Sequence, residues 1–328
     1  MKFVIDMMGG DFGSKTTVAA LLRFKQDYPN VTLYAVGKKE ELKALENVAE
    51  IIDARDVLKM DAGPLDALRS KESSMLKAIN LTKELNADAL ISAGGTAAFL
   101  SGATVRIKLI PGVERAALLA PFPTEIKGKY VAILDIGASS ENTANHLYQF
   151  AKMGQIYANS VFNLANPKTY LLNNGTEDTK GTVLHQEAHK LFKARELSDF
   201  YGNIEAREVL SGDADVVVAD GFSGNIFLKA TEGAASVLMG GVKKAFMHSA
   251  LTKLGYLFAK RGFKELATTF DYKNTGGAIL LGVNNVVIKA HGNSDERGFY
   301  SALIVAQKMA AAKIVETVKK GLTDEEKV

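Results

Sequence analysis

Short apolar runs rich in β-branched residues alternate with amphipathic stretches along most of this chain. The runs with strand character lie at residues 2–6, 31–37, 87–95, 129–138, 169–174, 215–220 and 285–290. Stretches with apolar residues at helical spacing lie at residues 15–26, 74–85, 96–107 and 301–322. Because strands that alternate with helices build parallel sheets covered on both faces, the pattern predicts a three-layer α/β/α fold with a mainly parallel sheet.

Composition narrows the class of protein. The 328 residues are 47% apolar and 23% charged, and no long linker interrupts them, so a single domain over residues 1–328 is expected. A net charge of +3 is too small to indicate a nucleic-acid partner. No stretch carries the ~20 apolar residues of a membrane-spanning helix, which predicts a soluble protein, and the lack of cysteine fits a cytoplasmic one. The absence of cysteine excludes disulfides, a cysteine nucleophile and thiolate metal sites.

Five predicted strands lead into glycine-rich loops that precede a helix. These loops read "MMGGDFGSK", "SAGGT", "NNGTEDTKG", "DGFSGN" and "AHGNSD". In a parallel sheet the carboxyl ends of the strands share one edge, so we expect the five loops to lie together. Backbone N–H groups and helix N-termini in such loops can bind an anion or a phosphate. Glycine is also common in ordinary βα turns, so one such loop alone would not indicate a ligand.

Other short motifs exclude several chemistries. None of the glycine-rich loops has the G-x-G-x-x-G or Walker A spacing, which argues against a dinucleotide or ATP site. His185 and His189 lie four residues apart on a predicted helix, a spacing that can bind a metal, but no third ligand is evident. We interpret this pair as a solvated helix face and expect neither a metal nor a cofactor. The chain contains no G-x-S-x-G motif, which argues against a serine hydrolase.

Residues 234–270 are predicted to form a basic amphipathic helical hairpin that projects from the body. No Asp or Glu occurs between residues 233 and 264, and Gly255 and Gly262 suggest the break between the two helices. Such a pair can lie on an anionic membrane surface, dock an acidic partner protein, or pack as a dimer interface. The residues expected at these contacts are Lys243, Lys244, Lys253, Leu254, Leu257, Phe258, Lys260 and Arg261.

Five segments together carry a resemblance to a known family. They read "DMMGGDFG", "ADALISAGGTAAFL", "LLNNGTEDTKG", "GNIEAREVLSGDADVVVADGFSGNIFLKATEG" and "GGAILLGVNNVVIKAHGNSD", in this order along nearly the whole chain. With these segments the sequence closely resembles the bacterial phosphate acyltransferases of phospholipid synthesis. It departs from the family at Gly95, where the motif usually carries Asn.

The resemblance implies an enzyme that transfers a fatty acyl group from acyl carrier protein to inorganic phosphate. The acyl phosphate would then serve a membrane glycerol-3-phosphate acyltransferase. The resemblance also implies a fold similar to that of isocitrate and isopropylmalate dehydrogenases, a homodimer, and a peripheral position at the inner face of the cell membrane. Because a thioester is already activated, the enzyme has to hold two anions together and stabilise an oxyanion, and no metal is required.

The expected site residues come from the same motifs. Lys180 is expected to anchor phosphate, Asn225 to donate to the oxyanion or to phosphate, and His291 to bind phosphate, protonate the leaving sulfur or cap a helix. Asp6 and Asp11 are expected to orient a lysine or to cap a helix. The residues expected to bind substrate or phosphate are Gly9, Gly10, Ser92, Gly94, Thr96, Gly181, Gly221, Ser223, Gly224 and Lys289.

Three alternative functions stay open from the sequence. A phosphotransacetylase-like enzyme would use acyl-coenzyme A as its donor, although the basic amphipathic hairpin favours a lipid-related substrate. A metal-dependent dehydrogenase shares the fold, but the chain lacks a nucleotide fingerprint. A non-catalytic scaffold at the membrane is favoured only by the altered loop around Gly95.

Overall fold

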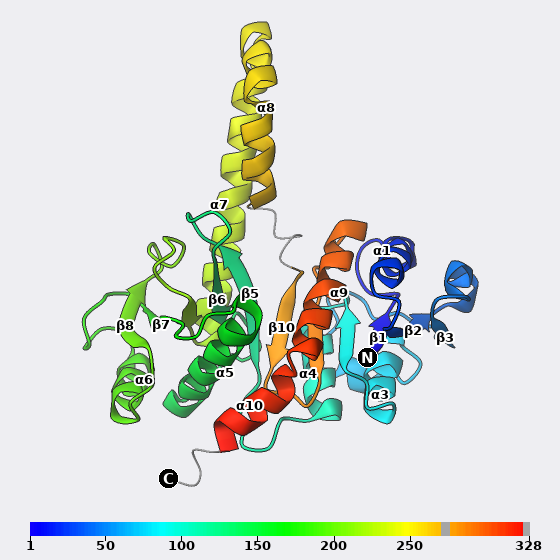
Figure 1. Cartoon of the computed structure of the whole chain (residues 1–328), viewed down its shortest axis with the longest axis horizontal. Coiled ribbons are helices and arrows are strands. Elements are labelled where there is room, and N and C mark those ends of the chain that lie inside the picture. The colour runs from blue at the N-terminus through cyan, green and yellow to red at the C-terminus, as the bar shows by residue number, and fades with distance from the viewer. Residues whose placement is uncertain (270–275, 324–328) are drawn as a thin grey trace.

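The computed structural model describes residues 1–269 and 276–323, which form an eleven-stranded sheet with helices on both faces (Figure 1). Across the sheet the strands follow the order β3-β2-β1-β4-β11-β10-β5-β6-β9-β7-β8. Their bounds are β1 Lys2–Asp6, β2 Thr32–Gly37, β3 Glu50–Asp53, β4 Ala89–Ser92, β5 Ala117–Pro123, β6 Tyr130–Leu134, β7 Thr169–Asn173, β8 Phe200–Glu205, β9 Val216–Val218, β10 Ala278–Leu281 and β11 Val286–Lys289. The predicted three-layer α/β fold is confirmed.

Each face of the sheet has its own helical layer and its own core. Helices α1, α5, α6, α9 and α10 cover one face, and α2, α3, α4 and the first turns of α7 cover the other (Figure 1). Phe24, Phe150 and Phe299 are buried in the first core, and Phe99 and Val217 in the second. The bounds are α1 Ser14–Asp27, α2 Asp66–Arg69, α3 Ser74–Glu84, α4 Thr96–Ile107, α5 Ala144–Phe162, α6 Val183–Ala194, α7 Gly221–Met247, α8 Ala250–Thr269, α9 Glu296–Ala311 and α10 Ile314–Thr323.

The strands point in two directions, because three antiparallel pairs lie in the middle of the sheet. β11 pairs antiparallel with β10, β10 with β5, and β5 with β6. The strands on either side of this centre are parallel to their neighbours. The carboxyl ends of β1, β4 and β11 therefore lie at one edge of the sheet, and those of β6, β7 and β9 at the opposite edge. The prediction that all five glycine-rich loops lie together is wrong, because "NNGTEDTKG" and "DGFSGN" follow β7 and β9.

Four strands, the helices α2 and α5, and one helix boundary differ from the predictions. The sequence patterns did not identify β3, β5, β8 and β10 as strands. In β5, Pro121 and Pro123 argue against a strand when only the sequence is considered. Proline cannot donate a hydrogen bond to a strand ladder and is unusual in a central strand. The stretch predicted as one helix over residues 301–322 is two helices, α9 and α10, which are separated at Lys313 with a φ of +51°.

The predicted hairpin is present and extends away from the body as α7 and α8 (Figure 1). Its turn lies at His248 and Ser249, and the predicted breaks at Gly255 and Gly262 are wrong because both glycines lie inside α8. The Ser249 hydroxyl accepts from the Thr252 N–H at 3.2 Å and thereby caps the first turn of α8. Residue 270, the last of the predicted hairpin, lies outside the described residues.

The two helices of the hairpin are held together by aromatic rings. Phe246 of α7 lies 5.6 Å from the ring centroid of Tyr256 and 4.6 Å from that of Phe263, both on α8. These contacts leave the opposite surfaces of both helices open to solvent. No helix in the described part of the chain is long and apolar enough to cross a membrane.

The N-terminus of α7 sits directly on the loop that follows β6. A Cβ atom on Gly224 would lie 2.0 Å from the carbonyl oxygen of Asp135, and one on Gly221 would lie 1.9 Å from that of Ser139. The Asn142 side chain adds to this contact by accepting the Gly221 N–H at 3.1 Å. Both glycines are therefore required by the close approach of helix and loop.

We expect Gly224→Ala to destabilise the fold by about 3 kcal/mol or more, because the added methyl group overpacks a buried contact. Gly240→Ala in the same helix meets no atom within 4 Å and should stabilise the protein by about 0.5–1 kcal/mol. Urea denaturation at equal protein concentration measures both changes. A Gly224→Ala protein as stable as wild type would show that α7 is not seated on Asp135.

Candidate active site

A cavity of about 1180 Å³ lies between α4 and α7, over the face of β5 and β10. This volume slightly exceeds the roughly 300–1,000 Å³ that is usual for small-molecule sites. Its floor and walls are apolar along the middle, and polar groups gather at two ends. The residues that line the middle are Leu100, Ser101, Thr104, Leu118, Ala120, Phe122, Leu228, Ala278 and Leu280.

One end of the cavity, here called the β11 end, lies at the carboxyl ends of β4 and β11. Lys289, His291 and Gly292 line it together with Thr96, the first residue of α4. Lys289 is only 7% exposed, and its ammonium group donates to the carbonyl oxygens of Ala93 and Ala290. No side chain caps the α4 N-terminus, so its backbone N–H groups face this end as a partial positive charge.

A buried carboxylate stands behind Lys289. Asp6, Ser92 and Lys289 are direct neighbours across β1, β4 and β11, so their side chains lie on the same face of the sheet. The Asp6 carboxylate accepts the hydroxyls of Ser74 and Ser92, both at 2.7 Å, and Ser92 in turn accepts the Gly94 N–H at 3.0 Å. This arrangement links Asp6 to the loop before α4.

Burial and the nearby negative charges shift the pKa of Lys289 in opposite directions. Burial lowers the pKa of Lys289 to about 8, and the negative charges of Asp6 and Asp11 act against a further fall. Burial also raises the pKa of Asp6, while its hydrogen bonds from Ser74 and Ser92 lower it. Lys289 therefore remains mostly protonated near pH 7 and presents a desolvated cation to the cavity.

The opposite end of the cavity, here called the β6 end, is formed by residues 137–140 and the first turn of α7. The Asp135 carboxylate accepts the backbone N–H groups of residues 137–139 at 2.8–3.0 Å and the Ser139 hydroxyl at 2.7 Å. Burial raises the pKa of Asp135, and these hydrogen bonds lower it. Asn225 packs on this loop, since a Cβ atom on Gly137 would lie 3.2 Å from the Asn225 Cγ.

The β6 end differs from the β11 end in charge, because the Asp220 carboxylate lies at the N-terminus of α7. This carboxylate caps α7 by accepting the N–H groups of Phe222 and Ser223 at 3.1 and 3.0 Å, and it lies 3.4 Å from His185 Nε2. Burial acts to raise the pKa of Asp220, but the adjacent His185 imidazole and the hydrogen bond from the Ser223 N–H outweigh it and hold the pKa below its ordinary range. A negative charge therefore already occupies the α7 N-terminus, which disfavours an anion there.

The structure brings five of the predicted site residues to the cavity: Thr96, Gly221, Asn225, Lys289 and His291. Lys180 does not line it. The Lys180 side chain is about half exposed, and its ammonium group lies 3.8 Å from Glu177 on the loop after β7. Gly181 packs beside it against Asn173 and His185.

The other predicted binding residues have packing roles in the structure. A Cβ atom on Gly9 would lie 2.5 Å from the Gly94 nitrogen, and one on Gly10 would lie 2.8 Å from the Gly292 carbonyl oxygen. The Asp11 N–H donates to that same carbonyl at 2.8 Å. The loops after β1, β4 and β11 therefore support one another behind the β11 end. Ser92 donates to Asp6, and Ser223 and Gly224 belong to the capped first turn of α7.

His185 and His189 do not form a solvated helix face, as the sequence had suggested, because both are buried. His185 faces Asp220, and His189 Nε2 lies 3.3 Å from Asp178 Oδ1. Burial lowers the pKa of His189, and Asp178 raises it. Across the described residues no group of three His, Asp or Glu side chains is placed to hold a metal ion.

Sequence reasoning missed the residues that form the body of the cavity. Leu100 and Thr104 lie on the inner face of α4, where their spacing predicts a helix face but not whether that face packs on the sheet or lines a cavity. Asp135 and Ser139 follow a strand in "DIGASS", a polar ending that could have marked a second site loop. Pro64 also lines the cavity, and it was missed because it lies in a loop of irregular sequence.

Solved structures with this architecture define the class of fold. The chain is similar to a phosphotransacetylase from Streptococcus pyogenes, with a TM-score of 0.61, 19% identity, and coverage of 96% of this chain and 94% of that one. It is also similar to 4-hydroxythreonine-4-phosphate dehydrogenase from Klebsiella pneumoniae, with a TM-score of 0.50 and 13% identity over 97% and 99% of the two chains. The sheet, its helical layers and the dehydrogenase-like fold are shared at these low identities.

Sequence comparisons give the family. A family model described as "Fatty acid synthesis protein" matches residues 1–317. A phosphate acyltransferase from Mycoplasma capricolum is 39% identical over 332 residues, which cover 99% of each chain, and one from Clostridium novyi is 41% identical over 97% of this chain and 98% of its own. The chain belongs to this family of phosphate acyltransferases, as its motifs predicted. It is an acyltransferase, and its reaction is acyl transfer to phosphate.

The charge on Lys289 should depend on Asp6. We expect Asp6→Asn to lower the pKa of Lys289 by about one unit, because the favourable negative charge is lost while burial remains. Phosphate affinity, measured by calorimetry between pH 6 and 9, should then fall at a lower pH than in wild type. Ser74→Ala is the companion variant, since it removes a hydrogen bond that lowers the pKa of Asp6 and should shift the profile in the same direction by less. Identical pH profiles for Asp6→Asn and wild type would remove Asp6 from this role.

Proposed function

We propose that the protein transfers a fatty acyl group from acyl carrier protein to inorganic phosphate, and that phosphate binds at the β11 end of the cavity. The observation that carries this placement is the buried Lys289, which faces the cavity beside the uncapped N-terminus of α4. A desolvated cation and free backbone N–H groups are together a phosphate site.

Two comparisons within the cavity support this end over the other. Arg115 and Lys229 also line the cavity, but both are exposed, and a charge in water attracts an anion less strongly than a desolvated one. At the β6 end the α7 N-terminus is already neutralised by Asp220. Phosphate binding at residues 220–225 is therefore less favourable than binding at Lys289.

The apolar middle of the cavity suits the acyl chain. Leu118, Ala120 and Leu280 on the sheet face Leu100 of α4 and Leu228 of α7 across it. Transfer of each CH₂ group from water to such surroundings contributes about 0.8 kcal/mol. A chain that extends from the β11 end toward residues 137–140 would place its thioester next to the phosphate.

The chemistry then needs orientation and charge stabilisation. A phosphate oxygen attacks the thioester carbonyl carbon, the carbon–sulfur bond breaks, and the thiolate leaves. Lys289 holds the phosphate, and the backbone N–H groups at the start of α4 lie where they can stabilise the oxyanion. His291, which lines the same end, is the proposed proton donor to the leaving sulfur. The oxyanion role predicted for Asn225 would require the thioester at the β6 end.

The hairpin is the proposed contact for the acidic carrier protein and for an anionic membrane surface. Residues 233–263 contain no Asp or Glu, and all the predicted contact residues on α7 and α8 are exposed. Leu251, Leu254, Leu257 and Phe258 are between 51% and 86% exposed on α8, which is unusual for large apolar side chains. We also propose that the protein forms a homodimer that shares part of this surface. The acyl phosphate would pass to a membrane glycerol-3-phosphate acyltransferase for phospholipid synthesis.

The assay that tests this function follows phosphate-dependent conversion of palmitoyl-acyl carrier protein to palmitoyl phosphate, with palmitoyl-coenzyme A as the competing donor. We expect Lys289→Met to lower kcat/KM for phosphate by roughly 10²–10³-fold, because it removes the cation and keeps the stem. Lys180→Ala should change kcat/KM less than about threefold, since its charge is exposed. The reverse pattern would move phosphate to the opposite edge of the sheet.

Binding to lipid vesicles tests the hairpin. We expect the triple variant Leu254→Ser, Leu257→Ser and Phe258→Ser to lose sedimentation with vesicles that contain anionic lipid, since each side chain contributes about 1.5–3 kcal/mol when buried. Lys253→Gln with Lys260→Gln should weaken binding by about 1 kcal/mol per charge, and only to anionic vesicles. Unchanged sedimentation together with loss of the dimer in light scattering would assign this surface to the subunit interface.

A further inference from the structure

Between β3 and α3 the chain makes an excursion whose two ends are joined. Asp56 and Ser73 pair in a parallel bridge, and the Ser74 N–H donates to the Asp56 carbonyl at 2.9 Å. The outer part of this excursion, residues 57–65, is here called the strap. Because these contacts fix the two ends of the excursion, the contacts at its base and at the tip of the strap determine where the strap lies.

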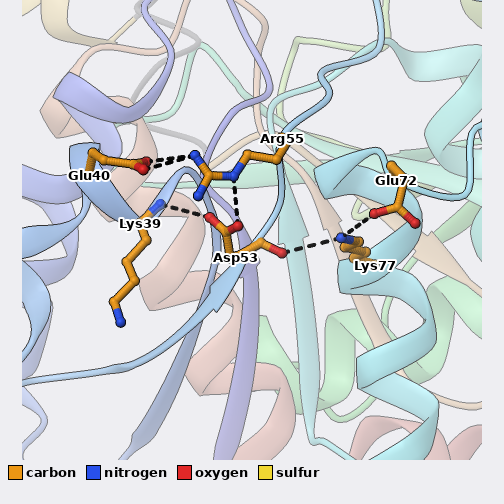
Figure 2. A network of polar contacts seen from close by, with 6 residues as sticks. All are labelled: Lys39, Glu40, Asp53, Arg55, Glu72 and Lys77. Atoms are coloured by element: carbon orange, nitrogen blue, oxygen red, sulfur yellow. Dashed lines mark hydrogen bonds and ion pairs between the residues drawn. The ribbon is translucent and has the colours of Figure 1, made fainter.

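Polar contacts hold the base of the excursion in place, as Figure 2 shows. The Arg55 guanidinium donates to both carboxylate oxygens of Glu40 at 2.9 and 3.0 Å and to the Asp53 carboxylate at 2.7 Å. Lys77 of α3 donates to the Asp53 carbonyl at 3.3 Å and lies 2.7 Å from Glu72. These groups are largely exposed, so the network orients the base more than it stabilises the fold.

The tip of the strap lies on two glycines at the β11 end of the cavity. A Cβ atom on Gly95 would lie 2.7 Å from the Met60 carbonyl oxygen, and one on Gly292 would lie 2.6 Å from the Met60 Cε. Gly292 and Pro64 both line the cavity, and Gly95 immediately precedes α4. The strap can approach this closely because neither glycine carries a side chain.

The strap packs against the second core through Leu58 and Ala62, and its other large apolar side chains lie at the surface. Met60 is 42% exposed, and Val57 and Leu65 are 52% and 55% exposed. Burial in a core therefore gives no reason for the apolar side chain of Met60. The place of Met60 on Gly95 and Gly292, beside the β11 end, gives one, because an apolar group at the mouth of a site excludes water from it.

We propose that the strap, through Met60, makes phosphate rather than water the acceptor of the acyl group. The proposal rests on the function proposed above. In acyl transfer to phosphate, a phosphate oxygen bonds to the acyl carbon, the carbon–sulfur bond breaks and the thiolate leaves. In the competing reaction a water oxygen forms that bond and gives up a proton, and the products are free fatty acid and thiol. In this proposal the strap keeps bulk water away from the acyl carbon while Lys289 holds the phosphate.

The test measures how the acyl group is partitioned between phosphate and water as acceptors. Purified full-length protein is incubated with palmitoyl-acyl carrier protein, with and without inorganic phosphate, and initial rates of palmitoyl phosphate and free palmitate are measured by mass spectrometry. Gly95→Ala pushes the Met60 carbonyl away, and Met60→Ala removes the cover over Gly292. We expect both to raise the ratio of palmitate to palmitoyl phosphate about tenfold, a change of about 1.4 kcal/mol in relative barrier height.

Two controls separate exclusion of water from a general effect on structure. Met60→Leu keeps an apolar cover of similar volume and should keep the wild-type ratio. Gly255→Ala makes the same substitution as Gly95→Ala at a position where the methyl group meets nothing within 4 Å. Wild-type ratios in both strap variants, or equal loss of both products, would overturn the proposal. Absence of palmitoyl phosphate with wild-type protein would instead overturn the proposed function.

Discussion

The reversal of strand direction in the middle of the sheet determines where the rest of the molecule lies. Because β10 and β5 pair antiparallel with their neighbours, the helices that follow β4 and β9 start at opposite edges of the same sheet. These helices, α4 and α7, cover the same face, so the space between them has a helix N-terminus at each end. The cavity over β5 and β10 is a direct consequence of this arrangement.

The two ends of the cavity differ in charge, although each begins with a helix. At the start of α4, Gly95 offers no capping side chain and Lys289 adds a buried positive charge. At the start of α7, the Asp220 carboxylate caps the helix and faces His185. The helix N-terminus at the β11 end is therefore more favourable for an anion than the one at the β6 end. The phosphate position proposed above depends on this difference between the capping residues of two helices.

The sequence predicted the helix α4, most strands, the hairpin and the position of Lys289, because periodicity and strand alternation are local properties. It could not give strand direction, since an apolar run looks the same in a parallel and an antiparallel pair. Without the strand directions, Lys180 was grouped with Asn225 and His291, although it lies outside the cavity that those two residues line. The strap was equally hidden, because the contacts of Met60 with Gly95 and Gly292 join residues that are far apart in the chain. Motif resemblance gave the family without these geometric details.

One helix connects the cavity to the surface of the hairpin. α7 starts at Gly221 beside the β6 end, passes the cavity with Leu228, and continues without interruption to Met247 at the hairpin turn. Its 27 residues correspond to about 40 Å of straight helix. The glycine contacts at its start fix this rod against Asp135 and Ser139, so the direction in which the hairpin projects is set inside the site. A carrier protein or membrane bound at α8 would therefore meet the cavity in a defined orientation, without any moving part.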